Sequence, residues 1–192
     1  MVRPWKLLGN RPGSAGFLPL SVGTYELPDG TEADWDIYGF AAVVAVLALT
    51  PEREVVLARQ FRPGPGLVLD EMPGGIVEDG EEVLAAAARE LLEETGFAAD
   101  LELAGGTWLA GASRTRRWVA VGRDARRVGD PTPGEGEFCE PVVVPLVSFR
   151  RQLAAGCLTD TDLGYLALDH LGLLGGGPPR AVTRPEDAQP SR

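Results

Sequence analysis

Three glutamate side chains, Glu90, Glu93 and Glu94, lie three and four residues apart in a stretch rich in alanine, leucine and glutamate. In an α-helix, residues at this spacing share one face. Like charges placed so close destabilise a helix slightly, and carboxylate oxygens are the ligands that Mg²⁺ prefers. Taken alone, the cluster fits a solvated acidic surface slightly better than it fits a site for a divalent cation.

The residues around these glutamates shift the balance toward a metal site. Pro73-Gly74-Gly75 predicts a loop whose carbonyl groups can approach a metal ion, because glycine has no Cβ atom to stand in the way. Arg89 adjoins the acidic face but lies roughly 100° around the helix, where it can pair with Glu81 or Glu93. We therefore expect Gly75, Glu81 and Arg89 to support the site by holding the loop against the helix.

The net charge of the chain is −10, from 28 acidic and 18 basic side chains. This balance argues against non-specific binding to nucleic acid or to an anionic membrane surface. An acidic protein also repels phosphates, so a phosphorylated substrate would need a bound metal ion to invert the local field.

Several features predict a cytoplasmic protein. The longest apolar run, Phe40 to Leu49, is about half of what a membrane span requires. The N-terminal residues lack the apolar segment of a signal peptide. Cys139 and Cys157 are far apart, which suits a reducing compartment and argues against a zinc ribbon or a disulfide scaffold.

The apolar pattern predicts strands on both sides of one central helix. We expect that helix from Glu81 to Thr95, with Gly96 as its C-cap and an apolar stripe formed by Leu84, Ala88, Leu91 and Leu92. Strands are expected at residues 40–49, 55–61, 67–72, 101–109, 117–121 and 142–146. Two closing helices are expected at 147–154 and 162–174. This order indicates an α+β or α/β sandwich.

The same pattern predicts three parts of the chain. Residues 1–39 contain a strand-turn-strand pattern and are expected to form a small sheet, a candidate dimerisation element. Residues 40–174 form the main domain. Residues 175–192 are rich in glycine, proline and charge, so we expect a disordered tail.

The stretch from Gly75 to Phe97 resembles the signature of the Nudix hydrolase superfamily. That signature reads G-x5-E-x7-R-E-U-x-E-E-x-G-U, where U is a bulky apolar residue, and every fixed position is matched. From ordinary residue frequencies, a chance match is on the order of one in a million. The segments Gln60-Phe61-Arg62 and Glu71-Met72-Pro73-Gly74 resemble the ADP-ribose pyrophosphatase branch of this superfamily.

The resemblance implies an α+β fold: a Nudix-type α/β/α sandwich with a mixed β-sheet, plus a small N-terminal antiparallel sheet through which members often form homodimers. It implies Mg²⁺ or Mn²⁺ as cofactor, with Glu90 and Glu94 as principal ligands. Glu93 would be a third ligand or a partner of metal-bound water, and the Gly74 carbonyl a further ligand. Arg62 and Glu71 would line the substrate site, where Arg62 could meet a phosphate oxygen.

The reaction implied is attack of water on phosphorus, with Glu93 and Glu94 at the catalytic centre and another carboxylate taking the proton. Glu137 is the first candidate for that base, because it lies in a glycine-rich stretch that could move over the site. Glu135 and Glu140 are close alternatives, and each of the three fits a solvated acidic turn as well. Trp35 is a candidate to stack on a substrate base.

One segment departs from the ADP-ribose pyrophosphatase pattern. Residues 109–117 lack the proline usual at this place and contain Arg114, Arg116 and Arg117. These arginines, with Arg114 as the named candidate, could bind a more anionic or differently shaped substrate. The alternative, slightly favoured, is that they decorate a strand edge and keep it soluble.

The predicted function is hydrolysis of the diphosphate linkage of a nucleoside diphosphate sugar, ADP-ribose or a relative, to a nucleoside monophosphate and a sugar phosphate. One alternative is a Nudix-fold module that senses such a ligand without hydrolysing it. The complete set of carboxylates argues against it, because a sensor does not need them all. The other alternative is a hydrolase of dinucleoside polyphosphates or nucleoside triphosphates.

Overall fold

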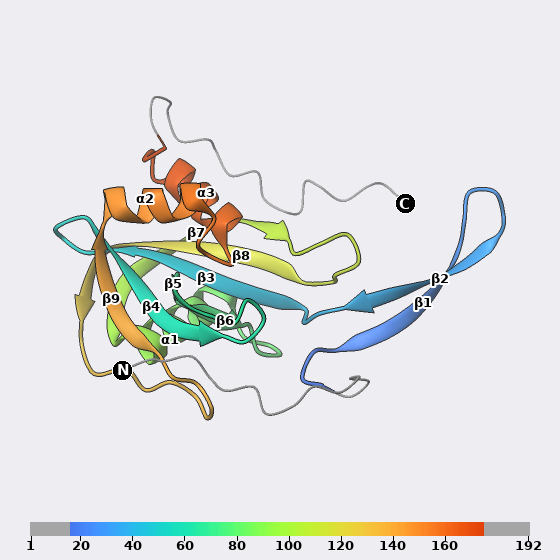
Figure 1. Cartoon of the computed structure of the whole chain (residues 1–192), viewed down its shortest axis with the longest axis horizontal. Coiled ribbons are helices and arrows are strands. Elements are labelled where there is room, and N and C mark those ends of the chain that lie inside the picture. Colours follow the sequence, from blue (N-terminus) through green and yellow to red (C-terminus); the bar gives the residue numbers. More distant parts are fainter. Residues whose placement is uncertain (1–15, 175–192) are drawn as a thin grey trace.

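A computed structural model describes residues 16–174 of the chain (Figure 1). In chain order its elements are β1 (Leu20–Glu26), β2 (Glu32–Tyr38), β3 (Ala42–Leu49), β4 (Glu54–Arg62), β5 (Leu67–Glu71), β6 (Gly74–Ile76), α1 (Val83–Thr95), β7 (Phe97–Trp108), β8 (Arg116–Arg127), β9 (Glu140–Pro145), α2 (Leu146–Ala155) and α3 (Thr161–His170). The N-terminal residues 1–15 and the tail expected at 175–192 lie outside the described residues.

The main sheet has seven strands, and it is mixed, as the family resemblance implied. Its central path runs β5-β4-β3-β8-β7, with β6 paired to β3 and β9 paired to β4. The β3–β8 pair is parallel, in register from Ala42 opposite Arg116 to Ala48 opposite Gly122. The other pairs in this sheet are antiparallel. A parallel pair requires a crossover connection, and α1 lies within the one between β3 and β8.

The strands β3 and β4 stay paired for only a short distance. Their register covers Ala48 opposite Val56 and Leu49 opposite Val55. Beyond this point β4 pairs with β5, whereas the first half of β3 pairs with the short strand β6. The sheet therefore splits between β3 and β4.

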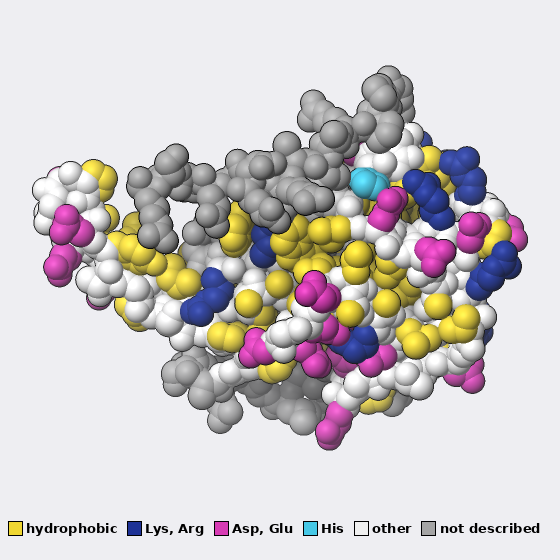
Figure 2. Space-filling view, turned by 180° about the vertical axis from the view of Figure 1, so that it is seen from behind, with side chains coloured by type: hydrophobic (Ala, Val, Ile, Leu, Met, Phe, Trp, Pro, Cys, Tyr) yellow, Lys and Arg dark blue, Asp and Glu magenta, His cyan; other side chains and the backbone are white. Residues whose placement is uncertain are grey.

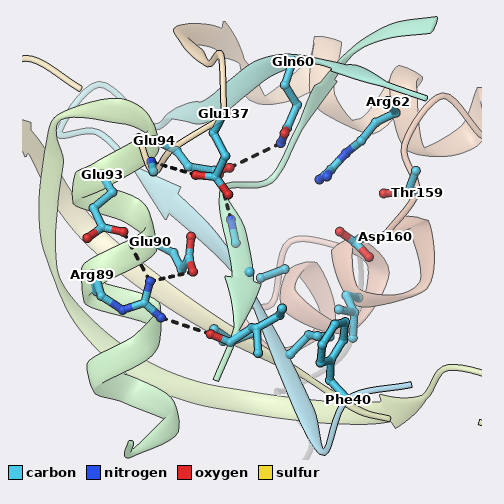
Figure 3. A pocket seen from close by; sticks show the side chains of 18 of the residues that line it. Phe40, Gln60, Arg62, Arg89, Glu90, Glu93, Glu94, Glu137, Thr159 and Asp160 are labelled. Carbon is cyan, nitrogen blue, oxygen red and sulfur yellow. Dashed lines mark hydrogen bonds and ion pairs between the residues drawn. The ribbon is translucent and has the colours of Figure 1, made fainter. Parts of the chain in front are cut away.

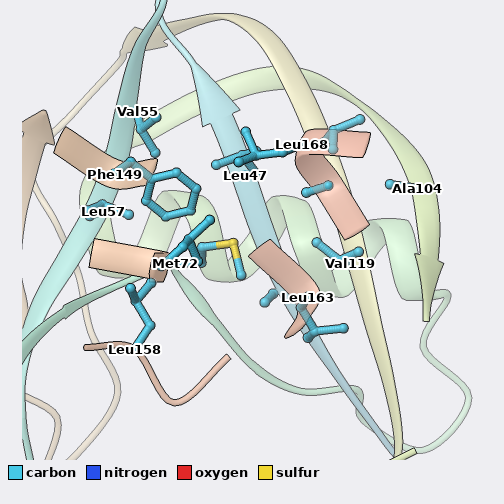
Figure 4. Packing of buried hydrophobic residues seen from close by; sticks show 14 of the residues in the cluster. Leu47, Val55, Leu57, Met72, Ala104, Val119, Phe149, Leu158, Leu163 and Leu168 are labelled. Carbon is cyan, nitrogen blue, oxygen red and sulfur yellow. The ribbon is translucent and has the colours of Figure 1, made fainter. Parts of the chain in front are cut away.

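Helices cover both faces of the sheet (Figure 1). Helices α2 and α3 cover one face, where Phe149 and Leu168 pack with strand residues such as Leu47 (Figure 4). On the other face, Leu91 of α1 packs with strand residues such as Val46. Strand β3 contributes apolar side chains to both faces of the sheet, because successive side chains of a strand point to opposite sides.

The central helix ends as predicted but buries a different stripe. Gly96 takes a left-handed conformation, with φ 74°, and its N–H donates to the Leu92 carbonyl over 2.8 Å. Leu91 is fully buried, but Leu84 and Leu92 are exposed, 39% and 41%, as is Ala88. The stripe predicted from the apolar residues was wrong. The buried face instead contains Ala86, Ala87, Glu90, Leu91, Glu94 and Thr95.

The first two strands form a separate antiparallel hairpin that projects from the main body (Figure 1). Hydrophobic side chains gather along it (Figure 2), and Leu20, Val22 and Trp35 are 61%, 63% and 55% exposed. The loop before β8 fixes the end of the hairpin that adjoins the main sheet, because the Ser113 hydroxyl and the Arg114 backbone N–H both donate to the Tyr38 carbonyl. An exposed apolar hairpin of this kind is typical of a contact surface.

The loop predicted at Pro73-Gly74-Gly75 contains the short strand β6, which was not expected from the sequence. A side chain at Gly74 would overlap the Val44 carbonyl, so only glycine lets this segment pair so closely with β3. None of the helices in residues 16–174 is both long and apolar enough to cross a membrane.

Candidate active site

A cleft of about 770 Å³ opens where β3 and β4 separate. Its walls come from β3, β4, β6 and α1, from the glycine-rich loop at 134–137, and from the residues before α3 (Figure 3). Three of the predicted ligands, Glu90, Glu93 and Glu94, line this one cleft. Gly74, Gly75, Arg62, Arg89 and Glu137 line it with them.

Glu94 is the most deeply buried carboxylate of the cleft, at 3% exposure. Its Oε2 accepts from the Gly74 backbone N–H over 2.9 Å, and its Oε1 accepts from Gln60 Nε2 over 3.4 Å. Burial raises the pKa of Glu94 to about 7, and the nearby charge of Glu90 acts in the same direction. The Cys139 thiol lies 3.6 Å from Oε1. A nearby cation would stabilise the ionised form of a carboxylate buried in this way, because it balances the negative charge.

Glu90 lies one turn earlier on the same buried face. It is 8% exposed, and burial raises the pKa of its carboxyl above the ordinary value. A methyl group at Gly75 would overlap the Glu90 carboxylate. The glycine therefore leaves room for this carboxylate to approach the β6 backbone closely.

Arg89 ties the helix to β6 and to the segment before the helix. Its Nε and Nη2 donate to the two Glu81 oxygens over 3.0 and 3.1 Å, and Nη2 donates to the Ile76 carbonyl over 3.0 Å. Its Nη1 donates to Glu90 over 2.7 Å and to Glu93 over 3.3 Å. Glu81 precedes the helix rather than beginning it, and the hydrogen bonds from Arg89 lower its pKa.

Three acidic residues in or near the glycine-rich loop were candidates for a base, and the structure separates them. Glu137 lines the cleft, and its Oε2 accepts from the Gly134 N–H over 2.9 Å. Glu135 does not line the cleft in the described part of the chain. Glu140 lies in β9 opposite Arg59, outside the cleft.

The predicted substrate residues fall into two groups. Arg62 lines the cleft and donates through Nε to Glu71, which also accepts from the Thr159 hydroxyl and from its backbone N–H over 3.0 Å. Glu71 is fully buried, so it holds Arg62 in place from beneath rather than facing the cleft. Trp35 and Arg114 do not line the cleft of their own chain as far as residues 16–174 define it.

Sequence reasoning gave no role to several residues of the cleft, among them the polar residues Gln60, Thr159 and Asp160. Gln60 was noted as part of a segment but given no role, and it donates to Glu94. Thr159 and Asp160 line the cleft beside Arg62 (Figure 3). They lie far from the glutamates in sequence, and no spacing rule connects them.

The donor set fits a divalent cation. Hard cations take carboxylate and carbonyl oxygens, and Glu90 and Glu94 are two buried carboxylates with raised pKa values beside a glycine-lined strand. As the side chains stand, no three acidic, thiol or imidazole groups of residues 16–174 are grouped closely enough to hold a metal. Arg89 donates hydrogen bonds to one carboxylate oxygen of Glu90 and one of Glu93. Glu93 and Glu137 line the same cleft.

Comparison with known proteins identifies the family of the chain. The family model described as NUDIX domain matches residues 39–157. An ADP-sugar pyrophosphatase of Mus musculus is 36% identical over 150 residues, which cover 69% of this chain and 69% of that protein. An ADP-ribose pyrophosphatase of Bacillus subtilis is 40% identical over 86 residues, 45% of this chain and 46% of that protein.

A solved structure supports the fold. A chain described as "Crystal structure of ADP compounds hydrolase" superposes with a TM-score of 0.67, covering 90% of this chain and 98% of that one, at 19% sequence identity. At this identity the match establishes the architecture, a mixed sheet between helices.

Proposed function

Since the chain belongs to the Nudix hydrolases, in the ADP-ribose pyrophosphatase-like branch, we propose that it hydrolyses the diphosphate linkage of a nucleoside diphosphate sugar. ADP-ribose or a close relative is the proposed substrate, and a nucleoside monophosphate and a sugar phosphate are the products. The observation that carries the proposal is one cleft that joins the buried carboxylates Glu90 and Glu94 to the cation Arg62. The mouse and Bacillus relatives, named for ADP-sugars and ADP-ribose, support the substrate class.

Nudix hydrolases use divalent metal ions, and we propose Mg²⁺ or Mn²⁺ here. Glu90 and Glu94 would be the principal ligands, with Glu93 and the Gly74 carbonyl completing the set. When bound, the cation neutralises the diphosphate and lowers the pKa of water. This resolves the difficulty that a chain of net charge −10 must accept an anionic substrate.

The other side chains of the cleft would bind the substrate, accept a proton and position the helix. Arg62, oriented by Glu71, would contact a phosphate oxygen and hold the diphosphate. Glu137 would take the proton from the attacking water, because it is the candidate base that lines the cleft. Arg89 would hold α1 against β6 through its bond to the Ile76 carbonyl.

A substrate panel tests the proposal. The purified chain is incubated with Mg²⁺ and with ADP-ribose, other nucleoside diphosphate sugars, dinucleoside polyphosphates and nucleoside triphosphates. The proposal expects nucleoside monophosphate and sugar phosphate from the sugars, with orthophosphate appearing only after phosphatase is added. Binding of ADP-ribose without turnover would instead favour a sensor. Faster turnover of polyphosphates would favour the other hydrolase.

We also propose that the protein is a homodimer formed through the β1–β2 hairpin. The exposed side chains of Leu20, Val22 and Trp35 support this, because an apolar hairpin of such exposure is stabilised by covering it. Trp35 and Arg114 keep a role in substrate binding only in such a dimer, since neither lines the cleft of its own chain in the described residues. Light scattering on the wild type and on Val22→Asp tests it: the wild type should have the mass of two chains, and the variant that of one.

A further inference from the structure

A second polar cluster faces the α1 carboxylates across the cleft. Figure 3 shows Arg62, Thr159 and Asp160 on the side opposite Glu90, Glu93 and Glu94. Arg62 is the cation proposed to meet phosphate, but Asp160 is an anion in the wall of a phosphate-binding cleft. Since a carboxylate repels phosphate, Asp160 requires a different explanation.

Arg117 fixes the position of Asp160. It is one of the arginines of the segment that departs from the ADP-ribose pyrophosphatase pattern, yet it is only 6% exposed. Its Nη2 donates to Asp160 Oδ1 over 2.5 Å, and its Nη1 donates to Asp162 Oδ2 over 3.0 Å. This guanidinium therefore neither decorates a strand edge nor reaches into the cleft. It holds the residues at the start of α3 against β8.

Asp160 stands at the N-cap of α3 but does not cap it. An aspartate at this position usually accepts from backbone N–H groups of the first turn, and the Asp160 side chain makes no such bond. Instead it turns toward Arg117 and the cleft, where 24% of the side chain remains exposed. Within residues 16–174, no group donates a hydrogen bond to its second oxygen, Oδ2. Asp160 therefore does not cap α3, and its carboxylate is instead a hydrogen-bond acceptor in the wall of the cleft.

We propose that Asp160, held by Arg117, accepts hydrogen bonds from sugar hydroxyl groups of the substrate and so selects diphosphates that carry a sugar. An ionised carboxylate only accepts, so its partner must be a donor such as a hydroxyl. A sugar bonded to the phosphate next to Arg62 brings hydroxyl groups to this wall. The cleft, of about 770 Å³, lies in the size range of small-molecule sites. The inference rests on the proposed function.

The test compares a substrate with its sugar and one without it. Equilibrium binding without added metal, and kcat/KM with Mg²⁺, are measured on the whole protein for ADP-ribose and for the methyl ester of ADP. Asp160→Asn keeps the size of the side chain but replaces the charged acceptor. Loss of hydrogen bonds to a charged group lowers the affinity and kcat/KM for ADP-ribose about 10- to 100-fold. The values for the methyl ester should change by about twofold or less.

Asp162→Asn is the matched control. Asp162 forms the other ion pair of Arg117, but its side chain is 48% exposed and does not line the cleft. Both ligands should respond to this variant by about twofold or less. If the Asp160 pair were merely structural, Asp160→Asn would weaken both ligands equally, and that result would overturn the inference.

The outcomes separate this inference from the proposed function. A wild type that hydrolyses neither compound contradicts the proposed function, but binding still decides the role of Asp160. Equal affinity of the wild type and Asp160→Asn for ADP-ribose overturns the role. So does a wild type that binds ADP-ribose no more tightly than the methyl ester.

Discussion

The two faces of the main sheet bury different kinds of side chain. Under α2 and α3, the cluster around Leu47, Leu57 and Phe149 consists of apolar residues that exclude water (Figure 4). Under α1, Glu90 and Glu94 are buried beside Leu91. Burial of apolar area stabilises a fold, whereas burial of an unneutralised carboxylate destabilises it. The apolar cluster of the first face therefore maintains the fold, and its buried cation Arg117 is paired with Asp160 and Asp162. The second face keeps carboxylates that the fold itself does not need.

The largest effect should come from Glu94→Gln. Loss of this carboxylate should lower kcat by at least about 1,000-fold, because the variant loses a principal ligand of the proposed cation. The melting temperature of the metal-free protein should stay the same or rise, because a neutral amide avoids the cost of burying a charge. Steady-state kinetics and thermal unfolding measure the two quantities. Glu52→Gln, in an exposed turn, is the control. Turnover of Glu94→Gln at the wild-type rate would remove Glu94 from the mechanism.

On the apolar face, Phe149→Ala should have the opposite effect: it should lower the stability and leave kcat nearly unchanged. Phe149 is fully buried, so its truncation should lower the free energy of unfolding by about 3–5 kcal/mol. The kcat of the folded fraction should remain close to that of the wild type, because Phe149 does not line the cleft. Urea unfolding followed by kinetics below the transition measures both. Val147→Ala, at an exposed position of the same helix, should change the stability by less than about 0.5 kcal/mol. A loss of kcat in the folded Phe149 variant would mean that the two faces are coupled.

A smaller effect should appear in the dependence of stability on pH. The pKa of Glu94 is raised by burial to about 7 in the folded protein, from an ordinary value of 4.5. The folded state therefore holds the proton more tightly, so the stabilising contribution is complete below pH 4.5 and is lost as the pH rises through 7. In the metal-free protein this loss amounts to about 3 kcal/mol at most. Chemical denaturation at a series of pH values measures it.

Two additions sharpen that experiment. Millimolar Mg²⁺ should remove most of the decline, because a cation that binds only the folded state stabilises it where the carboxylates are ionised. Glu94→Gln should show a weaker dependence than the wild type with or without the metal. Identical pH profiles for the wild type and this variant would exclude Glu94 as the titrating group.

The smallest of these effects should come from Gly75→Ala. A methyl group there would push the Glu90 carboxylate away from β6, and we expect kcat to fall about tenfold through displaced metal ligation. Gly111→Ala is the control, because nothing lies within 4 Å of a Cβ atom at that position. Titration of activity with Mg²⁺ should show weaker activation for the Gly75 variant alone. An unchanged titration would mean that the carboxylate has room to move.

The sequence predicted the fold well where local signals are strong. The strand expected at 40–49 is β3, and the helix expected from Glu81 is α1, which begins at Val83. The closing helices are α2 and a shorter α3. The parallel pairing of β3 with β8 was not predicted, because nothing in either strand identifies its partner. Likewise, β6 is too short and too rich in glycine to give a periodic signal.

The site was harder to predict, for a physical reason visible on α1. Apolar periodicity assumes that charged residues face water, and it therefore assigned Leu84 and Leu92 to the core in place of Glu90 and Glu94. The family signature identified the glutamates without that assumption. No signature extends to Asp160 and Arg117, which meet only when α3 packs against β8. Their pairing depends on tertiary structure alone.

The parallel contact between β3 and β8 has a consequence for synthesis of the protein. The two strands form the middle of the sheet, yet most of the cleft, the whole of α1 and all of β7 lie between them in the chain. Contacts between distant segments form slowly, because loop closure must be achieved before any pairing is gained. A nascent chain that ends before Arg116 lacks the strand against which β3 aligns. Helix α1, which carries Glu90 and Glu94, is therefore synthesised before β8, the strand that completes the middle of the sheet.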